Sequence, residues 1–194
     1  MSIQKRRERE RAEREKLIVT AARELAEAEG WDAVTTRRLA AEIEYSQPVL
    51  YSHFKGKDAI MAAVAVEGFT ELAVELRAAR AKAEGAREAL AAVGEAYTDF
   101  ARRRPALYDA MFTHTVDLPF ATPEAPAALH EAFGELLRAV EPIVTEGDDP
   151  GLLTETYWAG LHGLITLMRS GRLPKEAHTA RLTLLTAHFT ACAN

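Results

Sequence analysis

The chain has 194 residues and a mass of 21.3 kDa, enough for one medium domain or for a small domain fused to a larger one. With 48% hydrophobic and 27% charged residues it has the composition of a soluble globular protein, and no apolar run approaches the roughly 18 residues of a membrane span. This excludes a transmembrane protein. The N-terminus is polar and lacks the apolar stretch of a secretory signal, so we expect a cytoplasmic chain. The single cysteine, Cys192, excludes an intrachain disulfide and a Cys-rich zinc site, and we expect neither a metal ion nor a cofactor.

The charge is distributed unevenly. Residues 1–58 carry 12 Lys and Arg against 11 Asp and Glu, whereas residues 59–194 carry 12 against 18, which gives the net charge of −5. The first sixteen residues hold seven bases and four glutamates. This pattern fits either a solvated helical extension or an arm that contacts DNA.

Alanine-rich segments broken by Gly and Pro, without alternating polarity, predict an all-α fold of about nine helices. The first strong periodicity begins at Leu17 and stops at Gly30. Two short helices follow, the first capped by Thr35 or Thr36 and the second by Ser46. Pro48 lies in the first turn of the second short helix, where its missing amide hydrogen is harmless.

The remaining helices are longer and apolar on one side. We expect one from about Lys57 to Gly85 and others over residues 86–104 and 105–112. A helix carrying Leu129 to Val140 bends near Pro142, and the last two run over residues 151–170 and 174–193.

Three helical patterns within the first 55 residues, the second and third joined by a brief turn, predict a helix-turn-helix. The second helix of such a pair enters the major groove of DNA. Its first turn would present Gln47 to adenine and Pro48 and Val49 to thymine methyl groups. Side chains around this helix are candidates for contacts to phosphates: Thr35, Thr36, Ser46, Tyr51, His53, Lys55 and Lys57. Leu50 and Phe54 are expected in the core instead.

The stretch from Leu17 to Val64 resembles the DNA-binding domain of TetR/AcrR-type regulators, above all in the strings LAAEI (39–43) and LYSHFKGKDAI (50–60). The resemblance implies a homodimer with a three-helix DNA-binding domain, residues 1–58, and a larger helical bundle, residues 59–194, that binds a small effector and dimerises. Two residues depart from the family pattern. Glu44 stands where the family usually has glycine, and a positive φ there would cost about 1 kcal/mol, so we expect a slightly remodelled turn. Pro48 replaces a common small residue.

The string WAGLHGL (158–164) resembles a Trp-His-Gly type of TetR C-terminal domain. Gly160 and Gly163 would let another backbone approach, and Trp158 and His162 would share one face. His162 is either a ligand contact or a histidine bonded within the bundle. Aromatic and flexible side chains are either ordinary core or the lining of a largely apolar effector pocket: Tyr97, Phe100, Tyr108, Met111, Phe112, Phe133, Trp158 and His162.

The last two helices are broadly apolar, which favours a four-helix interface with a second copy of the chain. A two-fold pair would bind a palindromic operator in double-stranded DNA. Together with the effector-binding domain that the resemblance implies, this predicts a ligand-responsive regulator. Repression is the simpler consequence of occupying a promoter, and activation stays open.

Two other functional classes were weighed. An enzyme is disfavoured because Gly-x-Ser-x-Gly, His-Glu-x-x-His and Glu-x-x-His patterns are missing. The string Gly56-Lys57-Asp58 also lacks the remainder of a phosphate loop. A helical adaptor without sequence-specific DNA binding stays as the alternative, although it leaves Gln47, Lys55 and Lys57 without a partner.

Overall fold

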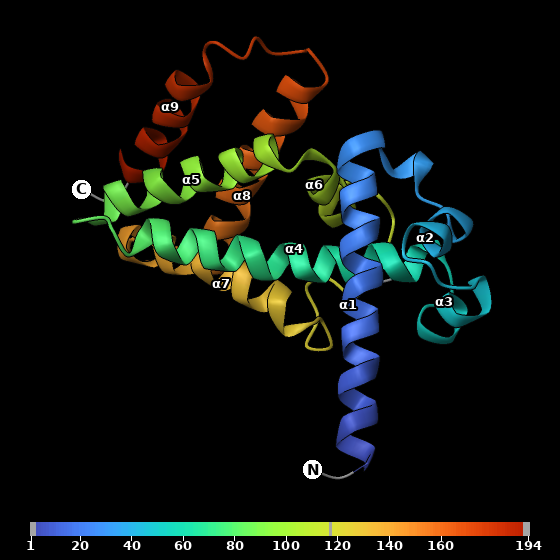
Figure 1. Ribbon diagram of the computed structural model, residues 1–194. Helices are drawn as coiled ribbons and strands as arrows, with labels where there is room; N and C mark the ends of the chain where they lie inside the picture. Colours follow the sequence, from blue (N-terminus) through green and yellow to red (C-terminus); the bar gives the residue numbers. More distant parts are fainter. Residues whose placement is uncertain (1–2, 117, 192–194) are drawn as a thin grey trace. The chain divides into compact units, whose positions relative to one another are not determined.

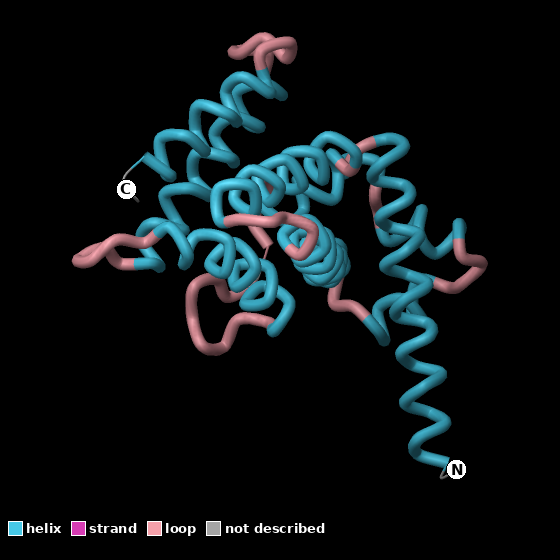
Figure 2. Tube along the Cα trace, turned by 90° about the vertical axis from the view of Figure 1, so that its left-hand side faces the viewer, coloured by secondary structure: helices cyan, strands magenta, loops and turns pink. Residues whose placement is uncertain are grey.

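The computed structural model describes residues 3–116 and 118–191, and all regular structure within them is helical (Figures 1 and 2). The α-helices are α1 Ile3–Glu29, α2 Thr36–Glu42, α3 Gln47–His53, α4 Lys57–Arg80, α5 Ala86–Arg103, α6 Pro105–Phe112, α7 Ala127–Val140, α8 Pro150–Arg169 and α9 His178–Ala191. Two 3₁₀ turns, η1 Trp31–Ala33 and η2 Glu141–Ile143, complete the regular structure. The predicted all-α fold with about nine helices is confirmed. Over the described residues, none of these helices combines the length and apolarity of a bilayer span.

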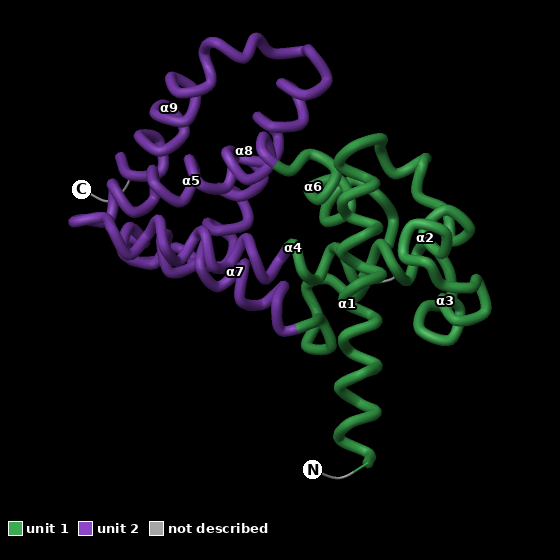
Figure 3. Tube along the Cα trace, in the orientation of Figure 1, with its two compact units in different colours: residues 1–68, 104–126 green, residues 69–103, 127–194 purple. Residues whose placement is uncertain are grey.

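The chain divides into two compact units, each built from two segments (Figure 3). Unit 1 contains Met1–Gly68 and Arg104–Pro126, and unit 2 contains Phe69–Arg103 and Ala127–Asn194. Unit 1 therefore holds α1 to α3, the first half of α4, and α6. These compact units differ in their bounds from the domains expected at residues 1–58 and 59–194. The assignment of DNA binding to the first domain and effector binding to the second stays a prediction.

Unit 1 buries one large side chain from each of its first three helices: Ile18, Leu39 and Leu50 have no exposed surface. The indole N–H of Trp31 donates to the carbonyl oxygen of Ala106 at 2.7 Å, which attaches α6 to the N-terminal helices. Burial of apolar side chains supplies most of the stabilising free energy of such a small unit.

Unit 2 has its core along one face of α5, where the predicted stripe of Leu90, Val93, Tyr97 and Phe100 is completely buried. The hydroxyl of Tyr157 in α8 donates to the carbonyl oxygen of Leu90 at 2.8 Å. A glycine is required beside this bond, because a Cβ at Gly94 would lie 2.4 Å from the Tyr157 oxygen. The small residue thus lets α8 approach α5 closely.

Several element ends differ from the sequence prediction. Helix α4 ends at Arg80 rather than near Gly85, because Lys82 and Ala83 bond to carbonyls three residues back and the Glu88 carboxylate takes the amide of Glu84. Helix α9 begins at His178 rather than at Pro174, whose carbonyl oxygen instead accepts a bond from the Arg181 guanidinium. Helix α1 extends regularly to Ile3. Cys192 and the predicted end of the last helix at Ala193 lie outside the described residues.

Candidate nucleic-acid interface

Helices α2 and α3 are joined by a tight turn whose geometry depends on Glu44. The Thr35 hydroxyl oxygen accepts the Arg38 amide at 3.2 Å and caps the start of α2, as predicted. At the other end, the amides of Glu44 and Tyr45 donate to the carbonyls of residues 41 and 40 at 3.3 and 2.8 Å. These two bonds define a Schellman motif, in which the residue after the helix cap is left-handed. Glu44 has φ 56°, so this non-glycine residue adopts the left-handed conformation and the expected remodelling of the turn is not observed.

Helix α3 begins at Gln47, with Pro48 in its first turn. The side chain of Ser46 makes no capping hydrogen bond, so the predicted capping hydroxyl is wrong at this position. The Ser46 carbonyl oxygen, instead, accepts the amides of Val49 and Leu50 at 3.1 and 3.2 Å. With Pro48 lacking an amide hydrogen, fewer N–H groups need a cap at this end, so a hydroxyl is not required to start the helix.

The side chains of α3 separate into an exposed face and a packed face. Gln47 and Pro48 are exposed, and 38% of the surface of Val49 and 51% of that of Tyr51 is accessible to solvent. Leu50 between them is fully buried, as expected of a core residue. Because one buried side chain anchors the helix and its neighbours face outward, α3 presents a rigid set of groups for contact.

A hydroxyl pair connects this exposed face to the start of α2. The Thr36 Oγ1 and Tyr51 Oη atoms lie 3.3 Å apart. Arg37 follows Thr36 and is exposed. Among the described residues Arg37 makes no ion pair. It was not among the contacts predicted from the sequence, although its position as a basic residue in the first turn of α2 could have indicated it.

The predicted phosphate contacts do not all lie on one free surface. Lys55 is exposed, as Gln47 is. His53 keeps only 7% of its side-chain surface and lies 3.3 Å from the Glu15 carboxylate of α1. The Lys57 ammonium donates to the Trp31 carbonyl oxygen at 2.5 Å. The last two side chains thus have partners within unit 1, and their roles toward DNA stay predictions.

The predicted effector residues fall in both units. In unit 2, Trp158 donates its indole N–H to the Tyr97 hydroxyl at 2.8 Å, and the rings of Trp158 and His162 lie 6.3 Å apart on the same helix. Burial, with a smaller contribution from Arg169, lowers the pKa of His162 below its ordinary value, so the neutral imidazole is favoured. Phe100 is fully buried and Phe133 is half-buried. In unit 1, the rings of Tyr108 and Phe112 are 4.8 Å apart, and Met111 is buried.

Within the described residues, no other backbone approaches the glycines of α8 closely. A Cβ at Gly160 would meet the side chain of Leu185 at 3.0 Å, not a backbone, and a Cβ at Gly163 would meet nothing within 4 Å. Gly160 therefore makes room for a leucine, and Gly163 faces open space.

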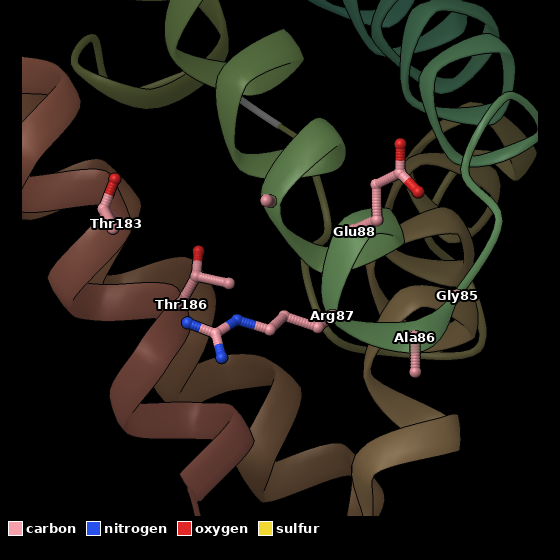
Figure 4. A pocket seen from close by; sticks show the side chains of 7 residues that line it. Gly85, Ala86, Arg87, Glu88, Thr183 and Thr186 are labelled. Carbon is pink, nitrogen blue, oxygen red and sulfur yellow. The ribbon is translucent and has the colours of Figure 1, made fainter.

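Unit 2 has two surface hollows, and both lie away from the predicted effector residues. The larger, about 540 Å³, is bordered by the start of α5 and by Thr183 and Thr186 of α9, and the Arg87 side chain reaches toward Thr186 (Figure 4). The second, about 340 Å³, lies between the end of α4 and α5. None of the predicted effector residues lines either hollow.

Comparison with known families agrees with this architecture. The model of bacterial regulatory proteins of the tetR family matches residues 18–64, and the model of the tetracyclin repressor-like C-terminal domain matches residues 90–189. The chain belongs to the TetR family. The resemblance found in the helix-turn-helix is thereby confirmed. The Trp-His-Gly string lies inside the matched C-terminal segment, and the subtype itself stays a prediction.

Individual proteins similar to this chain include two HTH-type transcriptional regulators and one solved structure. An uncharacterized HTH-type transcriptional regulator of Bacillus subtilis is 35% identical over 96 residues, which is 50% of this chain and 50% of that protein. One from Mycobacterium tuberculosis is 28% identical over 155 residues, 79% of this chain and 69% of that protein. A solved structure of a protein of unknown function from Rhodococcus sp. RHA1 superposes with a TM-score of 0.76 at 26% identity, over 91% of this chain and 93% of that chain. The chain thus spans about half the length of the first relative.

Proposed function

We propose that the protein is a ligand-responsive repressor that binds a palindromic operator as a homodimer. The observation that carries the proposal is the exposed first turn of α3, with Gln47, Pro48 and Val49 facing outward above the buried Leu50. A helix that is anchored on one side and polar or small on the other can enter the major groove as a rigid body.

Each exposed group of α3 suits a particular part of the duplex. The Gln47 amide can donate to and accept from one adenine edge, while Pro48 and Val49 contact thymine methyl groups. Tyr51, Lys55 and Arg37 reach phosphates, which position the helix without specifying sequence. Thr35, Thr36, Ser46, His53 and Lys57 complete the proposed set, the last two after exchanging or sharing their present partners.

The dimer would form through α8 and α9 in unit 2. Three leucines of these helices are exposed, with 63%, 40% and 70% of their surface accessible: Leu152, Leu167 and Leu184. Gly163 opens a space on the same helix as two of them, so a second backbone could approach there. Exposed leucines at helical spacing are typical of a surface that a partner covers. Two-fold pairing then sets the two α3 helices at roughly 34 to 36 Å, one turn of DNA.

A small, largely apolar effector would release the operator. Tyr97, Phe100, Phe133, Trp158 and His162 of unit 2 are its proposed contacts, with Tyr108, Met111 and Phe112 of unit 1. Helix α4 has residues in both units and would carry the change to the DNA-binding helices. A coupling of about 1 to 3 kcal/mol between effector and DNA is enough for a response. The protein would act in the cytoplasm, without catalysing a reaction.

The proposal is tested by recovering genomic fragments bound by the purified protein and measuring affinity for them at several salt concentrations. We expect a palindromic sequence bound with an affinity that falls steeply with salt. Absent or salt-insensitive binding would favour the helical adaptor instead. Sedimentation at micromolar concentration should give a dimer, and a monomer would reject the interface of α8 and α9.

A further inference from the structure

The first fourteen described residues, 3–16, form a basic helical arm at the start of α1. Figures 1 and 2 show these turns extending beyond the other helices of unit 1. Every residue of the arm is exposed or half-exposed. Its only apolar side chains are Ile3 and Ala12, so the arm has no surface that a hydrophobic partner could bury.

The charges of the arm do not neutralise one another. Three ion pairs join Arg6 to Glu10, Arg9 to Glu13 and Arg11 to Glu15, each across one helical turn. These pairs engage three of the four glutamates. Among the described residues Arg7 and Arg14 lie in no ion pair, so the arm retains exposed positive charge.

The order of charges also opposes helix stability. The amino end of a helix carries partial positive charge and favours acidic side chains. The first turn of α1 has no acidic residue and contains Lys5 and Arg6, with Arg7 directly after them. The pairs run from Arg to Glu, which is the less stabilising direction in a helix. A sequence that breaks a local rule in this way is expected where function requires it.

Arg7 and Arg14 lie on the same face of α1 as a residue that is buried further along the helix. Residues seven apart lie two turns apart on nearly the same face, so Arg7, Arg14 and Ala21 are aligned. Ala21 is buried within unit 1. The face that packs against the unit beyond residue 17 is therefore basic along the arm.

The arm runs past the end of α3. His53, the last residue of α3, lies 3.3 Å from Glu15, which places that end of α3 beside the top of the arm. At about 1.5 Å of rise per residue, Arg7 and Arg14 are roughly 10 Å apart along the helix, so both side chains can reach phosphates of one strand.

We propose that Arg7 and Arg14 bind the phosphate backbone of the duplex whose bases α3 contacts. This inference rests on the proposed function, because the duplex is the one held by α3. Two contacts in each protomer give four in the dimer, and each phosphate contact contributes about 0.9 to the slope of log affinity against log salt. The arm thus adds affinity for any DNA and no sequence preference.

The test compares two double variants of the full chain with equal changes in charge. Arg7→Gln with Arg14→Gln removes the aligned bases, and Arg9→Gln with Lys16→Gln removes a pair seven residues apart on the opposite face. Binding is measured with the operator and with an unrelated duplex of equal length, across salt concentrations. Glutamine keeps the helix propensity close to that of arginine, and circular dichroism with thermal unfolding confirms that both variants fold.

We expect the Arg7 and Arg14 variant to lose roughly 3 to 4 from the salt slope and at least about tenfold in affinity for both duplexes. The control should stay within about threefold of the wild type. Equal losses in the two variants, or no loss in the first, would overturn the proposal. Failure of the wild type to prefer any sequence would refute the proposed function instead, while the comparison on the unrelated duplex would still decide the role of the arm.

Discussion

The Glu27 carboxylate of α1 accepts the amide N–H of Leu107 in the first turn of α6 at 3.0 Å. The other oxygen of the same carboxylate accepts the amide of Ala106 at 3.2 Å. Since Pro105 has no amide hydrogen, these bonds satisfy the first two donors of α6 with a side chain 80 residues away in sequence. Helix α6 is thereby fixed to α1, in the unit that also holds α2 and α3.

Replacing Glu27 with alanine should lower the free energy of unfolding by about 1 kcal/mol, because a capping carboxylate at a helix start contributes that much. Denaturant unfolding followed by circular dichroism measures the change. Glu27→Gln keeps one acceptor oxygen and should lose less. An alanine variant as stable as the wild type would show that α6 does not need this cap.

Glu44→Gly should stabilise the protein by about 1 kcal/mol, since glycine adopts the left-handed φ at this position without a clash. Glu42→Gly, two residues earlier within α2, is the matched control and should destabilise by roughly the same amount. Chemical denaturation of both variants gives the comparison. A loss of stability on Glu44→Gly would contradict the strain assigned to the turn.

The Glu135 side chain is 1% exposed and accepts hydrogen bonds from Arg77, Arg80 and Arg138 at 2.8 to 3.1 Å. Burial opposes ionisation, but the bonds from Arg77 and Arg80 outweigh it and hold the pKa below the ordinary 4.5. Glu135→Gln should cost about 2 kcal/mol at neutral pH, because the bonds lose their charge.

The stability difference between the wild type and Glu135→Gln should depend on pH, with a direction set by the lowered pKa. A depressed folded-state pKa stabilises the protein above pH 4.5, and the contribution is lost as pH falls through the folded-state pKa. The gap between wild type and Glu135→Gln should therefore close below that pH. Glu131→Gln, one turn earlier on the exposed side of α7, serves as the control and should change stability by under about 0.5 kcal/mol.

Tyr157→Phe should lower the free energy of unfolding by about 1 kcal/mol, because the buried hydrogen bond from the hydroxyl to the Leu90 carbonyl oxygen would be lost. Burial raises the pKa of the Tyr157 hydroxyl to about 12, above the ordinary 10. The wild type should consequently lose stability as pH rises from 10 to about 12, and the phenylalanine variant should lose less. Parallel curves for the two proteins over that range would contradict this ionisation.

Local sequence features predicted most helices and the candidate interface. The stripe of α5 and the Thr35 cap each depend on residues within a few positions, so periodicity and capping chemistry were enough. The left-handed Glu44 was not predicted, because the missing glycine indicated a remodelled turn. The partners of His53 and Lys57 lie 38 and 26 residues away, and no local pattern indicates Glu15 or Trp31. For the same reason the sequence did not predict that α6 would be held by Glu27.

The central claim is that the exposed first turn of α3 contacts the bases of the operator. It is tested most directly by selecting bound sequences from a random pool of duplexes, once with the wild type and once with Gln47→Ala. The wild type should select a palindrome with adenine at one position in each half. Gln47→Ala should lose about 1 to 3 kcal/mol of discrimination at that position alone and keep the rest of the site. An unchanged preference at every position would contradict the placement of Gln47 against the bases.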